Sequence, residues 1–119
     1  MARTLLDPRD MRDEIARRKL NVLLSNEPTS VVSTPITLTD ADKVILVDDD
    51  TVGGSVTVNL PAVATSQGNN YYIKKLGVTG SVIVDASGSE TIDGQLTQTI
   101  TEQYVSIEIY CNGTEWFII

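Results

Sequence analysis

The chain has 119 residues and a mass of 12.9 kDa, which is enough for one modest domain with or without an arm. Nine basic residues against sixteen acidic ones give a net charge of −7, which disfavours binding to the phosphate backbone of a nucleic acid. The sequence has no histidine and a single cysteine, Cys111. It therefore excludes histidine-dependent nucleophile pairs, an internal disulfide and any multi-cysteine metal site. No apolar run approaches the roughly 18 residues of a membrane helix, and no signal-peptide core is visible, so we expect a soluble protein that is not exported.

The first 28 residues differ in charge from the rest of the chain. Every arginine lies within the first 18 residues, and residues 1–28 have a net charge of +1 against −8 for residues 29–119. A polar stretch with a proline, Ser25 to Ser30, separates the two parts. The sequence therefore predicts an N-terminal arm with its linker over residues 1–28 and a folded domain over residues 29–119.

The arm is predicted to contain a short α-helix. Asp7 suits the N-cap and Pro8 the first helical position, while Arg17 and Arg18 suit the negative end of the helix dipole. The apolar residues of this segment do not form one stripe, so an isolated helix would be marginal and needs a surface to dock on. That surface is either its own domain or another subunit.

After residue 30 the pattern changes to short strands. Runs rich in valine, isoleucine and threonine alternate with turn signals such as Gly53–Gly54, Asp93–Gly94 and Asn112–Gly113. Together they predict a mainly β domain, a small antiparallel β-sandwich or barrel-like module. The expected strands cover residues 44–47, 56–60, 71–76, 82–84, 96–100, 105–109 and 116–119.

Several of these strands are apolar on both faces, among them Val44–Val47, Val82–Val84 and Trp116–Ile119. A module of about 90 residues buries only about 60–65% of its unfolded surface, so a second apolar face favours a core completed by neighbouring copies. We therefore expect a homo-oligomer. The residues predicted to form the core and the contacts between copies are Val44, Leu46, Val84, Ile107, Trp116 and Ile118.

Four segments resemble small β domains of tailed-bacteriophage virion proteins, namely residues 34–48, 56–61, 90–94 and 112–119, the last with the sequence Asn–Gly–Thr–Glu–Trp–Phe–Ile–Ile. Such domains occur in capsid decoration (cement) proteins, head fibres and tail fibres, and they are generally trimeric. The resemblance covers residues 31–119 and implies a homotrimeric structural protein of the virion rather than an enzyme.

Within this group the sequence favours a capsid decoration or head-fibre subunit, because the apolar strand that ends the chain leaves no segment for a receptor-binding tip. The acidic domain would face outward on the capsid surface, and the protein would assemble in the host cytoplasm. The expected partners are further copies of the chain and the major capsid protein or another virion protein, with no cofactor, metal, nucleic acid or membrane. The residues expected to attach the arm to the capsid are Arg3, Arg9, Arg12, Arg17, Arg18 and Lys19.

A tail-fibre, receptor-binding or carbohydrate-binding β module is the alternative hypothesis. Exposed aromatic rings can stack on sugar rings, and Tyr72 and Tyr104 are the aromatic residues that we expect on the outside.

The acidic run Asp48–Asp50, with Asp40 and Asp42 upstream, could offer oxygen ligands to a hard cation, but its spacing does not match a calcium loop, and a solvated acidic turn is the favoured interpretation. Asp85, Glu90 and Asp93 lie close in sequence, yet their neighbours are typical of turns rather than of a catalytic pair.

Lys74 and Lys75 are adjacent within one expected strand, where one of them must face outward. The favoured interpretation is that they protect a sheet edge. Cys111 follows alternating apolar residues and is expected to be a buried small hydrophobe.

Overall fold

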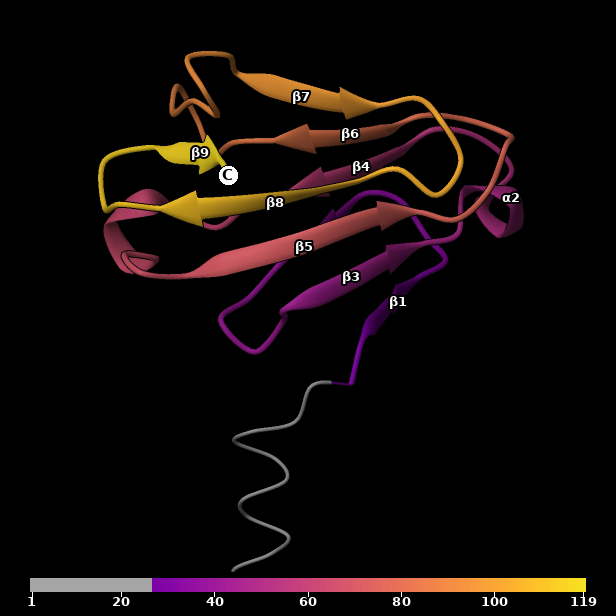
Figure 1. The fold of residues 1–119 in the computed structure, drawn as a ribbon, viewed down its shortest axis with the longest axis horizontal. Coiled ribbons are helices and arrows are strands. Elements are labelled where there is room, and N and C mark those ends of the chain that lie inside the picture. Colours follow the sequence, from indigo (N-terminus) through magenta and orange to yellow (C-terminus); the bar gives the residue numbers. More distant parts are fainter. Residues whose placement is uncertain (1–26) are drawn as a thin grey trace, which may run out of the picture.

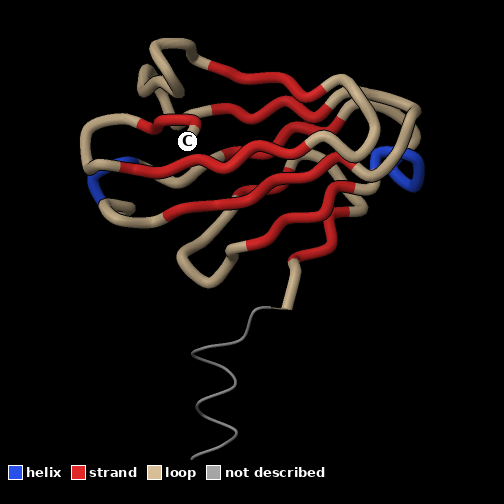
Figure 2. Tube along the Cα trace, viewed as in Figure 1, coloured by secondary structure: helices blue, strands red, loops and turns tan. Residues whose placement is uncertain are grey.

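The structure, a computed structural model, describes residues 27–119, which form two β-sheets with a shared core between them (Figure 1). Strands dominate this part of the chain, and its two helical segments are a single turn each (Figure 2). The six predicted attachment residues, and all but the last two residues of the predicted arm and linker at 1–28, lie outside the described part. The elements are β1 (Thr29–Val31), β2 (Ile36–Thr37), β3 (Val44–Val47), α2 (Asp49–Val52), β4 (Val56–Asn59), η1 (Val63–Thr65), β5 (Asn70–Lys75), β6 (Val82–Asp85), β7 (Thr97–Ile100), β8 (Ser106–Cys111) and β9 (Trp116–Ile118).

Both sheets are mixed. Sheet A has the strand order β1-β3-β5-β8-β9, and sheet B has the order β2-β4-β6-β7. Neighbours among β1, β3 and β5 are parallel, as are those among β2, β4 and β6. The pairs β5–β8, β8–β9 and β6–β7 are antiparallel. The mainly β prediction is confirmed, and the prediction of a purely antiparallel module is wrong.

The parallel pairs arise because the chain changes sheet after each of its first five strands. It runs along sheet A in β1, returns along sheet B in β2, and repeats this for β3, β4, β5 and β6 (Figure 1). Consecutive strands of one sheet therefore point the same way, and a strand of the other sheet serves as the crossover that parallel pairing requires. The connections after β3 and β4 contain α2 and η1, so neither is the tight turn of a hairpin.

The core lies between the inner faces of the two sheets. Side chains alternate along each strand, so that one set points inward and the next outward. Tyr71 and Trp116, both fully buried, pack with ring centroids 5.6 Å apart. The remaining buried apolar residues are Val31, Leu38, Ile45, Val47, Val56, Val58, Leu60, Val63, Ile73, Val82, Val84, Ala86, Ile92, Ile100, Ile109 and Cys111.

The outer edge of β9 is covered by the segment that precedes β7. The backbone N–H of Trp116 donates to Thr91 O at 2.9 Å, and Asp93 N–H donates to Trp116 O at 3.0 Å. The Asp93 carboxylate then accepts the N–H of Ile118 at 3.1 Å. These bonds close an edge that would otherwise be free to pair with another chain.

No helix in residues 27–119 combines the length and apolar character needed to cross a bilayer.

Candidate functional site

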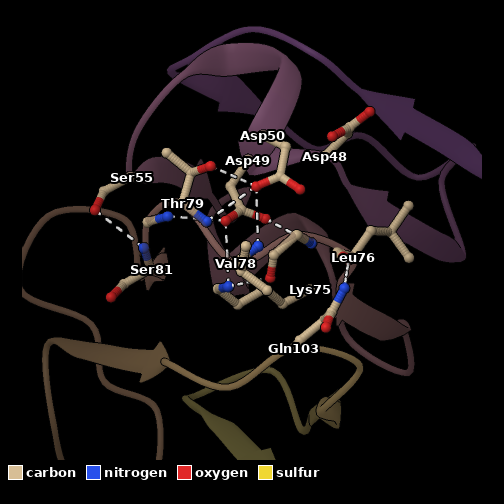
Figure 3. Close-up of polar contacts among 12 residues, drawn as sticks. Asp48, Asp49, Asp50, Ser55, Lys75, Leu76, Val78, Thr79, Ser81 and Gln103 are labelled. Atoms are coloured by element: carbon tan, nitrogen blue, oxygen red, sulfur yellow. Dashed lines mark hydrogen bonds and ion pairs between the residues drawn. The ribbon is translucent and has the colours of Figure 1, made fainter.

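The acidic run Asp48–Asp50 begins the one-turn helix α2, beside the loop between β5 and β6 (Figure 3). Asp48 is the N-cap: its carboxylate accepts Thr51 N–H at 3.1 Å and the Thr51 hydroxyl at 2.7 Å. Gly53 ends the helix in the left-handed conformation, with φ of 88°, which glycine adopts without strain. The first of the three carboxylates thus stabilises the start of a turn.

Asp49 is fully buried and forms an ion pair with the equally buried Lys75, with Nζ and Oδ2 3.2 Å apart. Its carboxylate also accepts the backbone N–H of Gly77 at 2.8 Å and that of Gly80 at 2.9 Å. The Lys75 ammonium donates in addition to Gly77 O. Burial alone would raise the pKa of Asp49, but the N–H of Gly80 and the Lys75 ammonium outweigh it, and the pKa lies below its usual value.

Asp50 faces the same loop from the exposed side (Figure 3). Its Oδ1 accepts Val78 N–H at 2.9 Å, Thr79 N–H at 3.0 Å and the Thr79 hydroxyl. The hydrogen bond from the Thr79 hydroxyl is the main reason that the pKa of Asp50 is lowered. The carboxylates of Asp49 and Asp50 together therefore accept hydrogen bonds from four consecutive backbone N–H groups, those of residues 77–80.

The loop of residues 77–80 can accommodate only glycine at two positions, Gly77 and Gly80. A Cβ on Gly77 would lie 2.6 Å from Asp49 Oδ1, and a Cβ on Gly80 would lie 2.3 Å from the backbone of Gly54. Both distances are shorter than real Cβ contacts. The close approach of backbone to carboxylate thus depends on these two glycines.

This arrangement is structural. The three carboxylates are occupied by backbone, hydroxyl and ammonium donors, and residues 27–119 contain no cluster of His, Cys, Asp or Glu that could hold a metal ion. The interpretation of Asp48–Asp50 as a solvated turn is wrong for Asp49, which is buried. The edge-protection interpretation of Lys74–Lys75 is also wrong, because β5 is the central strand of sheet A and Lys75 points into the core.

Two of the other three carboxylates, those of Glu90 and Asp93, also have local structural partners. Glu90 accepts Val63 N–H at 3.1 Å, Asp93 covers the edge of β9, and Asp85 ends β6. Cys111 is buried, as predicted, and burial raises the pKa of its thiol, which makes it a poor nucleophile.

A different kind of candidate site is the outer face of sheet A. Counting along the register, the outward positions of β3, β5, β8 and β9 hold mostly apolar or aromatic side chains. Tyr72, Tyr110 and Ile119 are 42%, 38% and 68% exposed. We define the outer face of sheet A as Val44, Leu46, Asn70, Tyr72, Lys74, Ser106, Glu108, Tyr110, Phe117 and Ile119.

A polar network crosses this face. Asn70 Nδ2 donates to Glu108 Oε2 at 3.2 Å, and Lys43 Nζ lies 3.5 Å from Asn70 Oδ1. The hydrogen bond between Tyr72 and Glu108 raises the pKa of the phenol. The polar groups of the face therefore bond mainly to one another, and the apolar side chains around them remain available.

The predicted contact residues divide between this face and the core. Val44 and Leu46 lie on the outer face of sheet A. Val84 and Trp116 are fully buried, and Ile107 and Ile118 pack against the core. Two of the strands that are apolar on both faces, β3 and β9, thus place their second apolar set on the same surface.

Both tyrosines expected on the outside are exposed, but they have different settings. Tyr72 lies within the outer face of sheet A, whereas Tyr104, 60% exposed, lies in the turn before β8 with φ of 67°. Lys74 Nζ donates to Tyr104 O at 3.0 Å and lies 5.8 Å from the centre of its ring. Tyr110, which the sequence analysis did not select, is exposed beside Tyr72 on the neighbouring strand.

The outer face of sheet B has the opposite character. Its outward positions are mostly threonine, asparagine and aspartate, with Ile83 the apolar residue among those in β2, β4, β6 and β7. Such a surface is what a solvated sheet requires. The two outer faces therefore differ: that of sheet B is polar, whereas that of sheet A presents exposed aromatic and aliphatic side chains.

Comparison with known proteins gives no further guide, since no protein-family model and no curated protein matches this sequence.

Proposed function

We propose that the protein is a structural, non-enzymatic subunit of a tailed-phage virion: a homotrimeric capsid decoration or head-fibre protein whose N-terminal arm binds the capsid. The resemblance of residues 31–119 to such domains supports this proposal, as does the separation of charge between the basic arm and the acidic domain. The carrying observation is the apolar outer face of sheet A, which is unlike the solvated face of sheet B and fits a protein that works in an assembly.

On this proposal the function is mechanical. Three linked arms bind neighbouring capsid subunits, and their linkage raises avidity beyond that of one arm. The acidic domains face outward and keep particles apart by like-charge repulsion. The partners are the chain itself and the major capsid protein or another virion protein, at the capsid surface.

The test is a binding assay of the purified full chain on assembled capsids that lack it. A triple variant, Arg17→Gln, Arg18→Gln and Lys19→Gln, removes three positive charges from the arm. The matched control, Thr97→Glu, Thr99→Glu and Thr101→Glu, shifts the net charge equally on exposed positions of the domain. We expect the arm variant to lose capsid binding and the control to keep it; equal binding by both would refute attachment through the arm.

A second candidate, carbohydrate binding, is favoured by the exposure of Tyr72 and Tyr104. It predicts binding to a glycan array that is lost in Tyr72→Ala or Tyr104→Ala and is independent of the arm. The aliphatic side chains of Val44, directly beside Tyr72, and of Leu46 and Ile119 on the same face argue for a protein partner instead, because sugars stack on aromatic rings rather than on branched aliphatic groups.

A further inference from the structure

Two of the three lysines in residues 27–119 lie on or at the border of the outer face of sheet A. Residues 27–119 contain twelve carboxylates and three lysines, a net charge of −9. Lys75 is buried with Asp49, whereas Lys74 lies on the outer face and Lys43 reaches Asn70 on it. The outer face contains one carboxylate, that of Glu108. Lys74 balances it, and with Lys43 included the net charge of the face and its border is +1. The rest of the domain therefore has a charge of −10.

The same face holds part of the exposed apolar surface of residues 27–119: Tyr72, Tyr110 and Ile119 lie on it, whereas the other exposed large hydrophobic residues, Val32, Val78, Leu96, Tyr104 and Val105, lie elsewhere. Tyr72 and Tyr110 sit on adjacent strands, with Glu108 opposite the first and Asn70 opposite the second. Phe117 pairs with Tyr110 and extends the aromatic row onto β9. Strand spacing of about 4.8 Å and a residue rise of about 3.3 Å give the face an area of about 400 Å². Asn70, Lys74, Ser106 and Glu108 occupy part of that area, and the apolar and aromatic side chains occupy the rest.

We infer that the outer face of sheet A binds a second copy of this chain, by packing its apolar side chains and its lysines against the acidic surface of that copy. This inference deepens the proposed function, because it assigns a surface to the proposed homotrimer.

Charge complementarity identifies the occupant. The face holds Lys74 and is bordered by Lys43, so an acidic surface can approach it without like-charge repulsion, and outside this face each copy of the domain is strongly acidic. The opposite arrangement, sheet B against sheet B, would bring two polar surfaces together with Asp85 on each. Contact through the lysine-bearing face is therefore the approach between copies with the least like-charge repulsion.

The area of the face indicates how the copies are arranged. About 400 Å² is roughly half of what one partner contributes to a standard interface. A stable assembly thus needs each copy to contribute a second surface. In a head-to-tail contact each copy contributes two different surfaces, one to each of its neighbours. Such contacts close into a ring when the rotation that relates one copy to the next is a simple fraction of a full turn.

The test measures the mass of the full chain in solution by light scattering coupled to size-exclusion chromatography, with sedimentation velocity as a second method. Tyr110→Glu places a carboxylate at an exposed position of the face, between Asn70 of β5 and Phe117 of β9. The matched control, Thr99→Glu, places the same charge on an exposed position of sheet B, opposite Ile83. Circular dichroism and thermal melting establish that both variants fold.

We expect the wild type and Thr99→Glu to have three times the monomer mass of 12.9 kDa, and Tyr110→Glu to have the monomer mass. A milder variant, Tyr72→Gln, should shift the same equilibrium toward monomer without adding a charge. A monomeric wild type at micromolar concentration would overturn the inference. An assembly that survives in Tyr110→Glu would also overturn it, because the contact would then lie elsewhere, for example in the arm.

Failure of this inference is distinguishable from failure of the proposed function. A dimer that Tyr110→Glu dissociates supports the assigned face but refutes a trimer. A monomer that still binds capsids through its arm refutes the assigned face and leaves attachment standing. If Tyr110→Glu loses capsid binding while its mass equals that of the wild type, the face binds another virion protein and the inference is refuted.

Discussion

The ion pair between Asp49 and Lys75 allows the sharpest test of how this fold is held together. Replacing Asp49 with alanine removes the carboxylate from the buried Lys75 ammonium, 3.2 Å away, and from the buried N–H of Gly77 and the N–H of Gly80. Loss of one partner from a buried pair costs about 3–5 kcal/mol, and each backbone donor left without an acceptor adds about 1–3 kcal/mol.

These contributions overlap, so we expect Asp49→Ala to lower the free energy of unfolding by about 4–6 kcal/mol. That is comparable with the entire stability of a small domain, about 5 kcal/mol at the low end, so the variant should melt at least about 15 °C lower. The assay is urea and thermal unfolding at pH 7, followed by circular dichroism and by the fluorescence of Trp116, the single and buried tryptophan.

A double-mutant cycle separates the ion pair from the backbone hydrogen bonds. Lys75→Met keeps the length of the side chain without its charge, and Asp49→Asn keeps one oxygen for the N–H groups. The double variant should be about 2 kcal/mol more stable than the sum of the single losses predicts. Asp50→Ala, on the exposed side of the same loop, is the control and should lose much less. A loss below about 1 kcal/mol for Asp49→Ala, the value of a surface ion pair, would refute the reasoning.

The pH dependence follows from the same carboxylate. Because the fold lowers the pKa of Asp49 below its ordinary value of 3.8, this group stabilises the native state fully above that value. Its contribution is lost as the pH falls through the native pKa. The wild type should therefore lose stability steeply below about pH 4, and Asp49→Asn should show a shallower loss over that range. Parallel pH profiles of the two proteins would contradict this assignment.

Three further predictions concern other parts of the domain. Gly80→Ala should lower stability by about 2–3 kcal/mol in urea unfolding, because the added Cβ would meet the backbone of Gly54; an unchanged midpoint would contradict it. Ser66→Ala should leave stability unchanged or raise it by up to about 1 kcal/mol, since the buried Ser66 hydroxyl has no hydrogen-bond partner within residues 27–119; a clear loss would indicate a partner. Burial raises the pKa of Tyr71 to about 12, so the neutral phenol, which donates to Thr39 O at 2.9 Å, stabilises the fold below pH 10. That contribution should disappear between pH 10 and about 12, and the Tyr71→Phe variant should lack this part of the loss.

Much of the strand content could be predicted from local pattern. The apolar run at Val44–Val47 and the terminal run from Trp116 are strands, and Cys111 is buried at the end of one. These features depend on side chains that alternate within a few residues, a signal that a single strand contains whatever its partners are.

Strand partners are a different matter, and here the prediction of antiparallel pairing failed. Short strands separated by glycine and asparagine suggest hairpins, but Thr29 pairs with Ile45 and Ile45 pairs with Ile73, across a strand of the other sheet. The sequence of a single strand does not determine which sheet that strand joins, because sheet membership depends on how the whole chain packs into two layers.

The roles of the charged residues were likewise decided by tertiary structure. In the sequence Asp49 is one of three adjacent aspartates and Lys75 one of two adjacent lysines, with nothing to distinguish them from their neighbours. Only the packing of α2 against the loop after β5 buries these two and leaves Asp50 and Lys74 at the surface. The sequence by itself determined which strands are apolar on both faces. The tertiary structure decided that the outward apolar side chains of β3 and β9 lie on the same surface. These two strands are far apart in the sequence, and it is the strand order of sheet A that places both in one sheet.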